Sequence, residues 1–145
     1  MELNTKYHGV INIEEEEIIR FESGIPGFSE ETKFILLPLE ENSPYYIMQS
    51  LKTSELGFVV TEPFSFFKDY EFRLGESEKE ALNIKEDSKI QVLSILSLKE
   101  PFSNTTANLQ APVVINHTNK LAKQIILNDT KYTTRHKLSS EVVKK

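Results

Sequence analysis

Cysteine is absent from this sequence of 145 residues, and so is any long hydrophobic run. Without cysteine the chain forms no disulfide, has no thiol nucleophile and cannot hold zinc through thiolates, which fits a reducing compartment. A membrane-spanning helix needs roughly 18 or more apolar residues in succession, and no such stretch occurs. The N-terminus MELNTKYHGV also lacks a basic segment followed by an apolar run, so no secretory signal is predicted and a cytoplasmic location is expected.

Basic residues are the scarcer charged type, with 17 Lys and Arg against 22 Asp and Glu, for a net charge of −5. Residues 1–31 carry eight acidic and two basic side chains, whereas residues 118–145 carry two acidic and seven basic ones. An acidic body repels the phosphates of nucleic acid and attracts a basic partner protein. A solvated acidic surface that serves solubility is an equally good interpretation.

Short runs of β-branched and aromatic residues dominate what is present, and turn residues separate nearly all of them. The expected strands are Ile18–Phe21, Lys33–Leu39, Tyr45–Leu51, Phe58–Thr61, Tyr70–Leu74, Ile90–Leu98, Val113–Asn116 and Gln124–Leu127. Ile90–Leu98 follows neither strict alternation nor a helical period, which indicates a central strand with both faces covered. One helix is expected at Ser77–Asn83, where Ser77 caps the first turn and Glu80 completes a capping box.

These elements predict a mainly β fold, a small antiparallel β-barrel-like single domain with one short helix, because closing a sheet removes its exposed edges. A two-sheet sandwich is the alternative. The length suits one domain, which we place at residues 1–130. Residues 131–145 are polar and basic, and we expect a frayed helix or a disordered tail there.

Residues that could carry catalysis or bind a metal are scattered along the chain. His8, His117 and His136 lie far apart, and neither a Gly-rich phosphate loop nor a G-x-S-x-G turn occurs. We therefore predict no catalytic residue, no metal site and no cofactor. The run Glu14–Glu17 lacks the geometry of a calcium loop, because neighbouring residues in a strand point to opposite faces. A solvated charge run is the favoured interpretation, and a contact for a basic partner is the alternative.

Two segments suggest surfaces that bind other proteins. Pro63–Tyr70 carries four aromatic side chains in eight residues, and most of them should be core. If Phe66 or Phe67 projects outward, it forms a binding hot spot beside the acidic surface. Asn108–Asn116 contains a central proline and predicts an edge strand, which can recruit a strand from a partner.

The order and spacing of several motifs resemble the FliW family of flagellar assembly factors over nearly the whole chain. These motifs are the GIPGF turn at Gly24–Phe28 with Phe21 before it, the residues Pro63, Phe64 and Tyr70, the TANLQAPVVIN segment, Gln124–Leu127, Tyr132 and Arg135. Gln110 departs from the pattern, in which a basic residue is expected.

The resemblance implies a protein-binding factor and no enzyme. Proteins of this kind bind flagellin in the cytoplasm and, alternatively, the dimeric RNA-binding protein CsrA, whose repression of flagellin mRNA translation they relieve. The resemblance implies no direct nucleic-acid binding and no membrane binding. We expect partner contacts at a set of acidic, aromatic and polar residues: Glu14, Glu15, Glu16, Glu17, Glu22, Phe28, Phe66, Phe67, Asp69, Tyr70, Glu71, Asn108, Asn116, Tyr132 and Arg135.

CsrA must be basic to hold RNA, so an acidic surface should attract it. This negative field is expected from Glu14–Glu17, Glu22, Asp69 and Glu71. The basic side chains of the tail are expected on a different surface, either for flagellin or for solubility: Lys131, Arg135 and Lys137. An RNA-binding barrel that uses the basic tail is the main alternative function. An enzyme that uses buried carboxylates and His117 is a weaker alternative.

Overall fold

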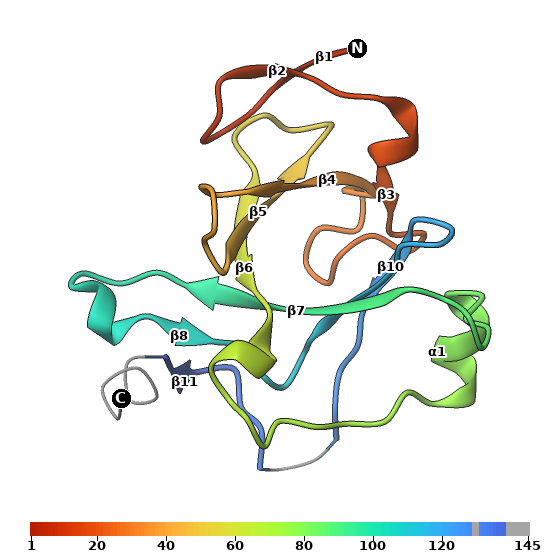
Figure 1. Cartoon of the computed structure of the whole chain (residues 1–145), viewed down its shortest axis with the longest axis vertical. Coiled ribbons are helices and arrows are strands. Elements are labelled where there is room, and N and C mark those ends of the chain that lie inside the picture. Colours follow the sequence, from red (N-terminus) through yellow and green to blue (C-terminus); the bar gives the residue numbers. More distant parts are fainter. Residues whose placement is uncertain (129–130, 139–145) are drawn as a thin grey trace.

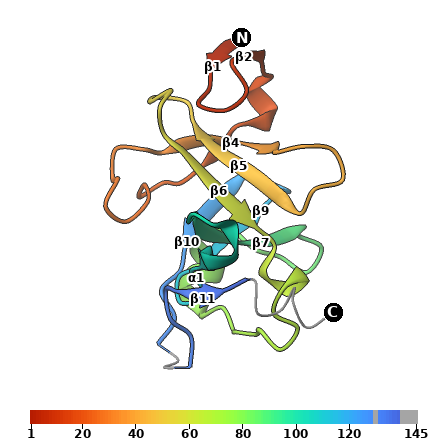
Figure 2. The same cartoon turned by 90° about the vertical axis from the view of Figure 1, so that its left-hand side faces the viewer.

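The computed structural model describes residues 1–128 and 131–138, and a closed seven-stranded β-barrel forms its centre (Figure 1). The barrel strands are β3 (Ile19–Arg20), β4 (Lys33–Pro38), β5 (Tyr45–Ser50), β6 (Gly57–Thr61), β7 (Ile90–Ser97), β9 (Val113–Asn116) and β10 (Leu121–Gln124). The outer elements are β1 (Glu2–Asn4), β2 (Val10–Asn12), β8 (Thr106–Ala107), β11 (His136–Lys137), the helix α1 (Glu76–Ala81) and the 3-10 turns η1 (Glu15–Glu17), η2 (Pro63–Ser65) and η3 (Phe102–Asn104). Two views show the β1–β2 hairpin at one end of the long axis and α1 and β11 toward the other (Figures 1 and 2).

The barrel closes because β7 pairs with β6 and with β9, and because β10 pairs with β3. All pairs in the ring are antiparallel except the last, in which Leu121 lies beside Arg20 in a parallel arrangement. The N–H of Arg20 donates to the carbonyl of Lys120 at 2.8 Å and supports this short closure. The predicted mainly β barrel is thus confirmed, with one parallel pair in place of a fully antiparallel ring.

Alternate residues of the barrel strands point inward, as the two-residue repeat of a β-strand requires. Phe34, Met48 and Val60 from three consecutive strands are fully buried in this interior. Phe21 joins them and meets the ring of Phe34 edge to face, with centroids 5.3 Å apart. Ile25 of the GIPGF turn packs into the same cluster, so this turn contributes to the core.

The residues between these inward positions form two further cores on the outside of the barrel. Ile47, Val59 and Val114 pack under the segments that follow η2 and β10. On another side of the barrel, Ile35 packs against the N-terminal hairpin. In β7, apolar residues occupy inward and outward positions alike: Leu93 is buried inside the barrel and Leu96 in the outer core. This confirms the prediction that both faces of the strand are covered.

Several element boundaries differ from the expectation. Tyr70–Leu74 is not a strand but an irregular segment on the outside of the barrel, held by its side chains. β10 begins three residues before the predicted strand because it pairs with β9 directly after a tight turn. The helix begins after Gly75, whose N–H donates to Glu78 Oε1 at 2.8 Å, so Ser77 is not the cap. No helix in the described residues is long and apolar enough to cross a membrane.

The expected tail is wrong for residues 131–138. Tyr132 and Leu138 are buried in the outer core, and β11 between them pairs with β8. Each of these strands has two residues, so their sequence carries little β signal. Residues 139–145 of the expected tail lie outside the described part of the chain.

Candidate protein-binding surface

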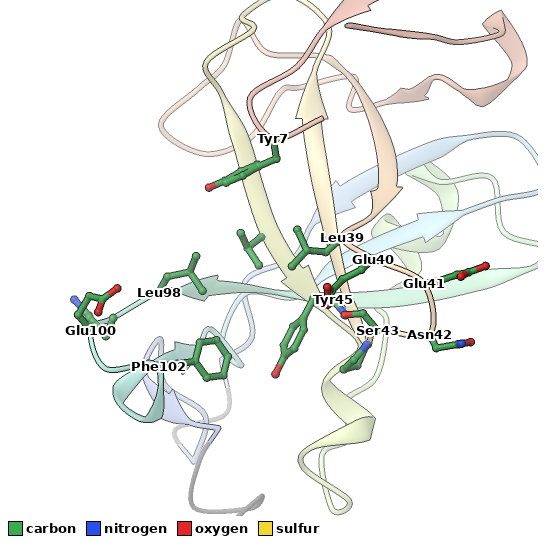
Figure 3. A pocket seen from close by; sticks show the side chains of 13 residues that line it. Tyr7, Leu39, Glu40, Glu41, Asn42, Ser43, Tyr45, Leu98, Glu100 and Phe102 are labelled. Carbon is green, nitrogen blue, oxygen red and sulfur yellow. The ribbon is translucent and has the colours of Figure 1, made fainter. Parts of the chain in front are cut away.

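A groove with a volume of about 640 Å³ lies on the outside of the barrel, where the end of β7 separates from β6 (Figure 3). Apolar side chains from separate segments converge on it, and we call this site the apolar groove: Tyr7, Leu39, Tyr45, Val59, Leu98 and Phe102. Tyr7 comes from the β1–β2 loop and Phe102 from η3, so the groove exists only in the folded chain.

Four of these side chains are exposed to an unusual degree for their size. The exposed fraction is 38% for Leu39, 45% for Tyr7, 49% for Leu98 and 50% for Phe102. Single exposed apolar residues are ordinary on a protein surface, but several that converge on one hollow are typical of a contact with another molecule. The apolar groove is therefore the strongest candidate for a binding surface on the described part of the chain.

The β1–β2 loop is fixed above the groove by hydrogen bonds to the barrel. The N–H of Lys6 donates to Gln49 Oε1 at 2.9 Å, and His8 Nε2 lies 3.0 Å from the carbonyl of Pro38. Gln49 is fully buried, and its Nε2 donates to carbonyls of the β5–β6 turn. Tyr7, between these anchors, is thus held in place.

Tyr45 forms the floor of the groove and is fixed by neighbouring rings. Its ring stacks on Phe66 with centroids 5.9 Å apart and meets Phe102 edge to face at the same distance. Burial raises the pKa of the Tyr45 phenol above its ordinary value, so the group stays neutral at physiological pH. A rigid aromatic floor loses little conformational entropy when a partner binds.

Acidic side chains lie at the edge of the groove, with Glu40 beside Tyr45 and Glu41 turned away from it (Figure 3). Glu40 and Glu41 lie in the β4–β5 turn and Glu100 follows β7, while Lys99 is the basic residue among the lining groups (Figure 3). In residues 1–128 and 131–138 none of these three carboxylates forms an ion pair. The groove therefore presents an apolar surface with a net negative edge.

The seam between β6 and β7 is short, and this shortness opens the groove. β6 pairs with β5 along its whole length but with β7 only through Val60 and Thr61. The N–H of Ser50 donates to the carbonyl of Leu56 and continues the β5–β6 ladder. The backbone groups of every second residue, counted from Leu56, therefore point toward β5. The backbone groups of Gly57 and Val59 accordingly point toward β7, and Gly57 lies past the end of the seam.

Many predicted contact residues gather on a second surface, around a hollow of about 360 Å³ that Phe67, Asp69, Tyr70 and Tyr132 line. Tyr70 and Tyr132 are buried, with exposed fractions of 4% and 8%. Burial, with a smaller contribution from Tyr132, raises the pKa of Tyr70 far above its ordinary value. These two tyrosines have structural roles here, which corrects the expectation that they contact a partner directly.

This second surface carries charges of both signs. Lys131 lines the same hollow as Asp69 and a neighbouring hollow with Glu71, so part of the basic tail shares the surface expected to be acidic. η1 lies between β2 and β3, at the opposite end of the molecule from the segment that links β6 to α1 (Figures 1 and 2). The single acidic field expected from these residues is therefore wrong.

The remaining acidic and aromatic candidates lie in varied environments. Glu14, Glu15, Glu16 and Glu17 are all exposed, but Glu15–Glu17 form a 3-10 turn and not the strand assumed for them. Glu22 is exposed beside the GIPGF turn. Phe28 is 43% exposed, and its ring lies 5.7 Å from that of Phe58. Phe66 and Phe67 are half-buried, whereas Phe64 is the exposed ring of that segment.

The predicted polar contacts are mostly structural. Asn116 is fully buried, and its Nδ2 donates to the carbonyl of Leu82 at 3.0 Å, so it holds the end of α1 and cannot touch a partner. Asn108 is half-buried and accepts hydrogen bonds from the N–H groups of Gln110 and Ala111. Arg135 is exposed and remains available.

His117, the histidine considered for catalysis, lies in a chain of polar contacts. His117 Nε2 lies 2.6 Å from Gln91 Oε1, and Gln91 Nε2 donates to Glu62 at 2.8 Å. Burial, and then the charge of Lys120, lower the pKa of His117. Among residues 1–128 and 131–138, no three His, Asp or Glu side chains come together to hold a metal ion.

Sequence reasoning missed the apolar groove. Its residues come from unremarkable places, such as Leu39 before a Glu-Glu turn and Leu98 beside Lys99. The one available signal was large apolar residues flanked by charged residues and proline, as in Leu98–Phe102. Such residues are not needed for a strand or for its core face, so they are candidates for exposed positions.

Comparison with known proteins agrees with the motifs. The family described as FliW protein matches residues 2–138. A flagellar assembly factor FliW from Bacillus subtilis is 51% identical over 141 residues, which cover 97% of this chain and 99% of the relative. One from Geobacillus sp. is 52% identical over 145 residues, with both chains fully covered. A crystal structure of the flagellar assembly factor FliW gives a TM-score of 0.89 at 49% identity, and the match covers 95% of this chain and 96% of that one. The chain therefore belongs to the FliW family of flagellar assembly factors.

Proposed function

We propose that this chain binds cytoplasmic flagellin and, alternatively, the translational repressor CsrA. When flagellin is scarce, the free factor binds CsrA, and translation of flagellin mRNA proceeds. When flagellin accumulates, it occupies the factor and CsrA is released. Family membership across residues 2–138 carries this proposal, and the apolar groove with its acidic edge supports a role in protein binding.

Such a switch requires negative coupling between the two partners. If flagellin weakens the binding of CsrA by some factor, CsrA must weaken the binding of flagellin by the same factor. The coupling needs no chemical step, so the proposal assigns no catalytic residue to this chain.

Electrostatic attraction of CsrA is assigned to the acidic turn at η1. Its carboxylates are exposed and lie within a single short turn. The reversal Glu15→Lys with Glu16→Lys should slow CsrA association by roughly tenfold and weaken its salt dependence. The matched reversal Asp69→Lys with Glu71→Lys should have a smaller effect, because Lys131 already offsets those charges. Equal association rates for all three proteins would rule out this assignment.

Size-exclusion chromatography tests the switch directly. The purified chain should elute together with purified CsrA, and addition of flagellin should separate them and shift the chain into a flagellin complex. A three-component complex, or no complex with either protein, would contradict the proposal.

A further inference from the structure

The apolar groove has the properties of a binding site for another molecule. Tyr7, Leu98 and Phe102 each expose close to half of their surface around it. Two elements of the fold hold Tyr7 and Phe102 there, the hydrogen-bonded β1–β2 loop and the ring stack on Tyr45. In the free protein these apolar groups contact water. A partner that covers them is therefore stabilised by apolar burial, and little conformational entropy is lost because the groups are already held in place.

The edge of the groove indicates the charge of the occupant. Glu40, Glu41 and Glu100 carry three negative charges against the one positive charge of Lys99. Because the carboxylates have no ion-pair partner among the described residues, a Lys or Arg that arrives with the occupant can approach them. An acidic segment would be repelled.

The open end of the β6–β7 seam indicates the shape of the occupant. Val59 lines the groove and lies opposite Leu96 at the end of the seam, so the free edge of β6 begins at Gly57. On the opposite side of the opening, Leu98 directly follows the last residue of β7. An extended segment can pair with a free strand edge, and its alternate side chains then enter a pocket on one side.

We propose that the apolar groove binds an extended segment of a partner protein, in which large apolar side chains alternate with Lys or Arg. The backbone of the segment pairs with the free edge of β6 at Gly57. Its apolar side chains cover Tyr45, Leu98 and Phe102, and its basic side chains meet Glu40 and Glu41. The inference rests on the proposed function only in taking a protein as the partner class.

A phage-displayed library of random peptides tests the specificity of the groove. Selection on the wild-type chain should enrich peptides in which Phe, Leu or Ile alternates with Lys or Arg. A variant with Leu98→Ser and Phe102→Ser should bind those peptides more than roughly tenfold more weakly. The matched control is Phe64→Ser with Ile126→Ser, which alters two exposed apolar residues outside the groove, at 48% and 57%, and should bind normally. Equal binding by both variants, enrichment of acidic peptides, or no enrichment would overturn the proposal.

Two experiments with one selected peptide test the electrostatic attraction and the backbone pairing separately. Glu40→Lys with Glu41→Lys should weaken binding at physiological salt, whereas Glu86→Lys with Asp87→Lys changes the charge equally at two exposed positions outside the groove and should not. N-methylation of alternate peptide nitrogens should weaken binding strongly at the set that faces β6 and little at the other set. Equal effects of the two sets would rule out strand pairing.

Purified flagellin and CsrA complete the experiment. If the wild-type chain binds neither protein but binds the selected peptides in the groove, the proposed function fails and this inference stands. If the chain binds flagellin or CsrA while the groove variants and their controls bind the peptides equally, the inference fails and the proposed function stands.

Discussion

The rings of Tyr70 and Tyr132 meet edge to face, with centroids 4.7 Å apart. Tyr70 Oη donates to the carbonyl of Leu109 at 2.8 Å, and Tyr132 Oη accepts a hydrogen bond from the N–H of Glu71 at 3.0 Å. The pair joins the irregular segment after η2 to residues 131–138 and holds both against the outside of the barrel.

Removal of this pair should destabilise the fold in two steps. Tyr70→Phe should cost about 1–2 kcal/mol, because the buried carbonyl of Leu109 loses its donor. Tyr132→Ala should cost roughly 3 kcal/mol or more, because it also leaves a cavity. Urea unfolding measures both values. Tyr7→Phe alters an exposed ring and is the control, expected within about 0.5 kcal/mol of wild type. A Tyr70→Phe effect no larger than this control would contradict the assigned role.

Ser50 and Glu31 form a buried polar contact that should contribute to stability. Ser50 Oγ donates to Glu31 and accepts from the N–H groups of Lys52 and Thr53 at 3.0 and 2.9 Å. Ser50→Ala should lower the free energy of unfolding by about 2–3 kcal/mol, because a carboxylate and two N–H groups lose a partner. Ser54→Ala, at an exposed position of the same turn, should change it by less than about 0.5 kcal/mol. Similar midpoints for the two variants in denaturant would refute this contact as a source of stability.

The two glycines of the GIPGF turn should differ in their tolerance of alanine. Both have positive φ, +72° for Gly24 and +86° for Gly27, which costs a side chain about 1–2 kcal/mol. A Cβ at Gly24 would also lie 2.4 Å from the backbone oxygen of Ser29, whereas one at Gly27 meets nothing within 4 Å. Thermal unfolding should therefore show Gly24→Ala as clearly less stable than Gly27→Ala. The reverse order would contradict the geometry of this turn.

Two histidines should make stability fall in mild acid. Burial lowers the pKa of His136 and of His117 below the ordinary value of 6.5, with Lys120 adding to the effect at His117. His136 Nε2 also accepts the N–H of Thr133 at 2.9 Å, which requires a neutral ring. Since the unfolded chain takes up protons first, the stabilisation is complete above about pH 6.5 and declines as the pH falls toward the lower pKa of the folded chain.

Urea unfolding between about pH 5 and pH 7 measures this decline. The double variant His117→Asn with His136→Gln should show a shallower slope over that interval, because it lacks the two titrating rings. An unchanged slope would assign the acid sensitivity to other groups.

The strand regions and the closed barrel were predictable because each depends on a local pattern. Lys33–Pro38 and Tyr45–Ser50 are short runs rich in apolar and aromatic residues between turn signals, which is typical of a strand. Family motifs such as GIPGF were readable for a related reason, since a turn with two positive φ values restricts its residue types. β8 and β11 were missed because two-residue strands are defined by their neighbours.

The sequence by itself determined the class of the molecule: a cysteine-free β-barrel with an acidic N-terminal region, similar to the FliW family. Only the tertiary structure decided which side chains are accessible. It buried Tyr70 and Asn116, placed Lys131 beside Asp69, and left Leu98 and Phe102 exposed around a groove. Accessibility depends on which distant segment covers a residue, and chain segments that lie far apart in the sequence meet only when the whole barrel has closed.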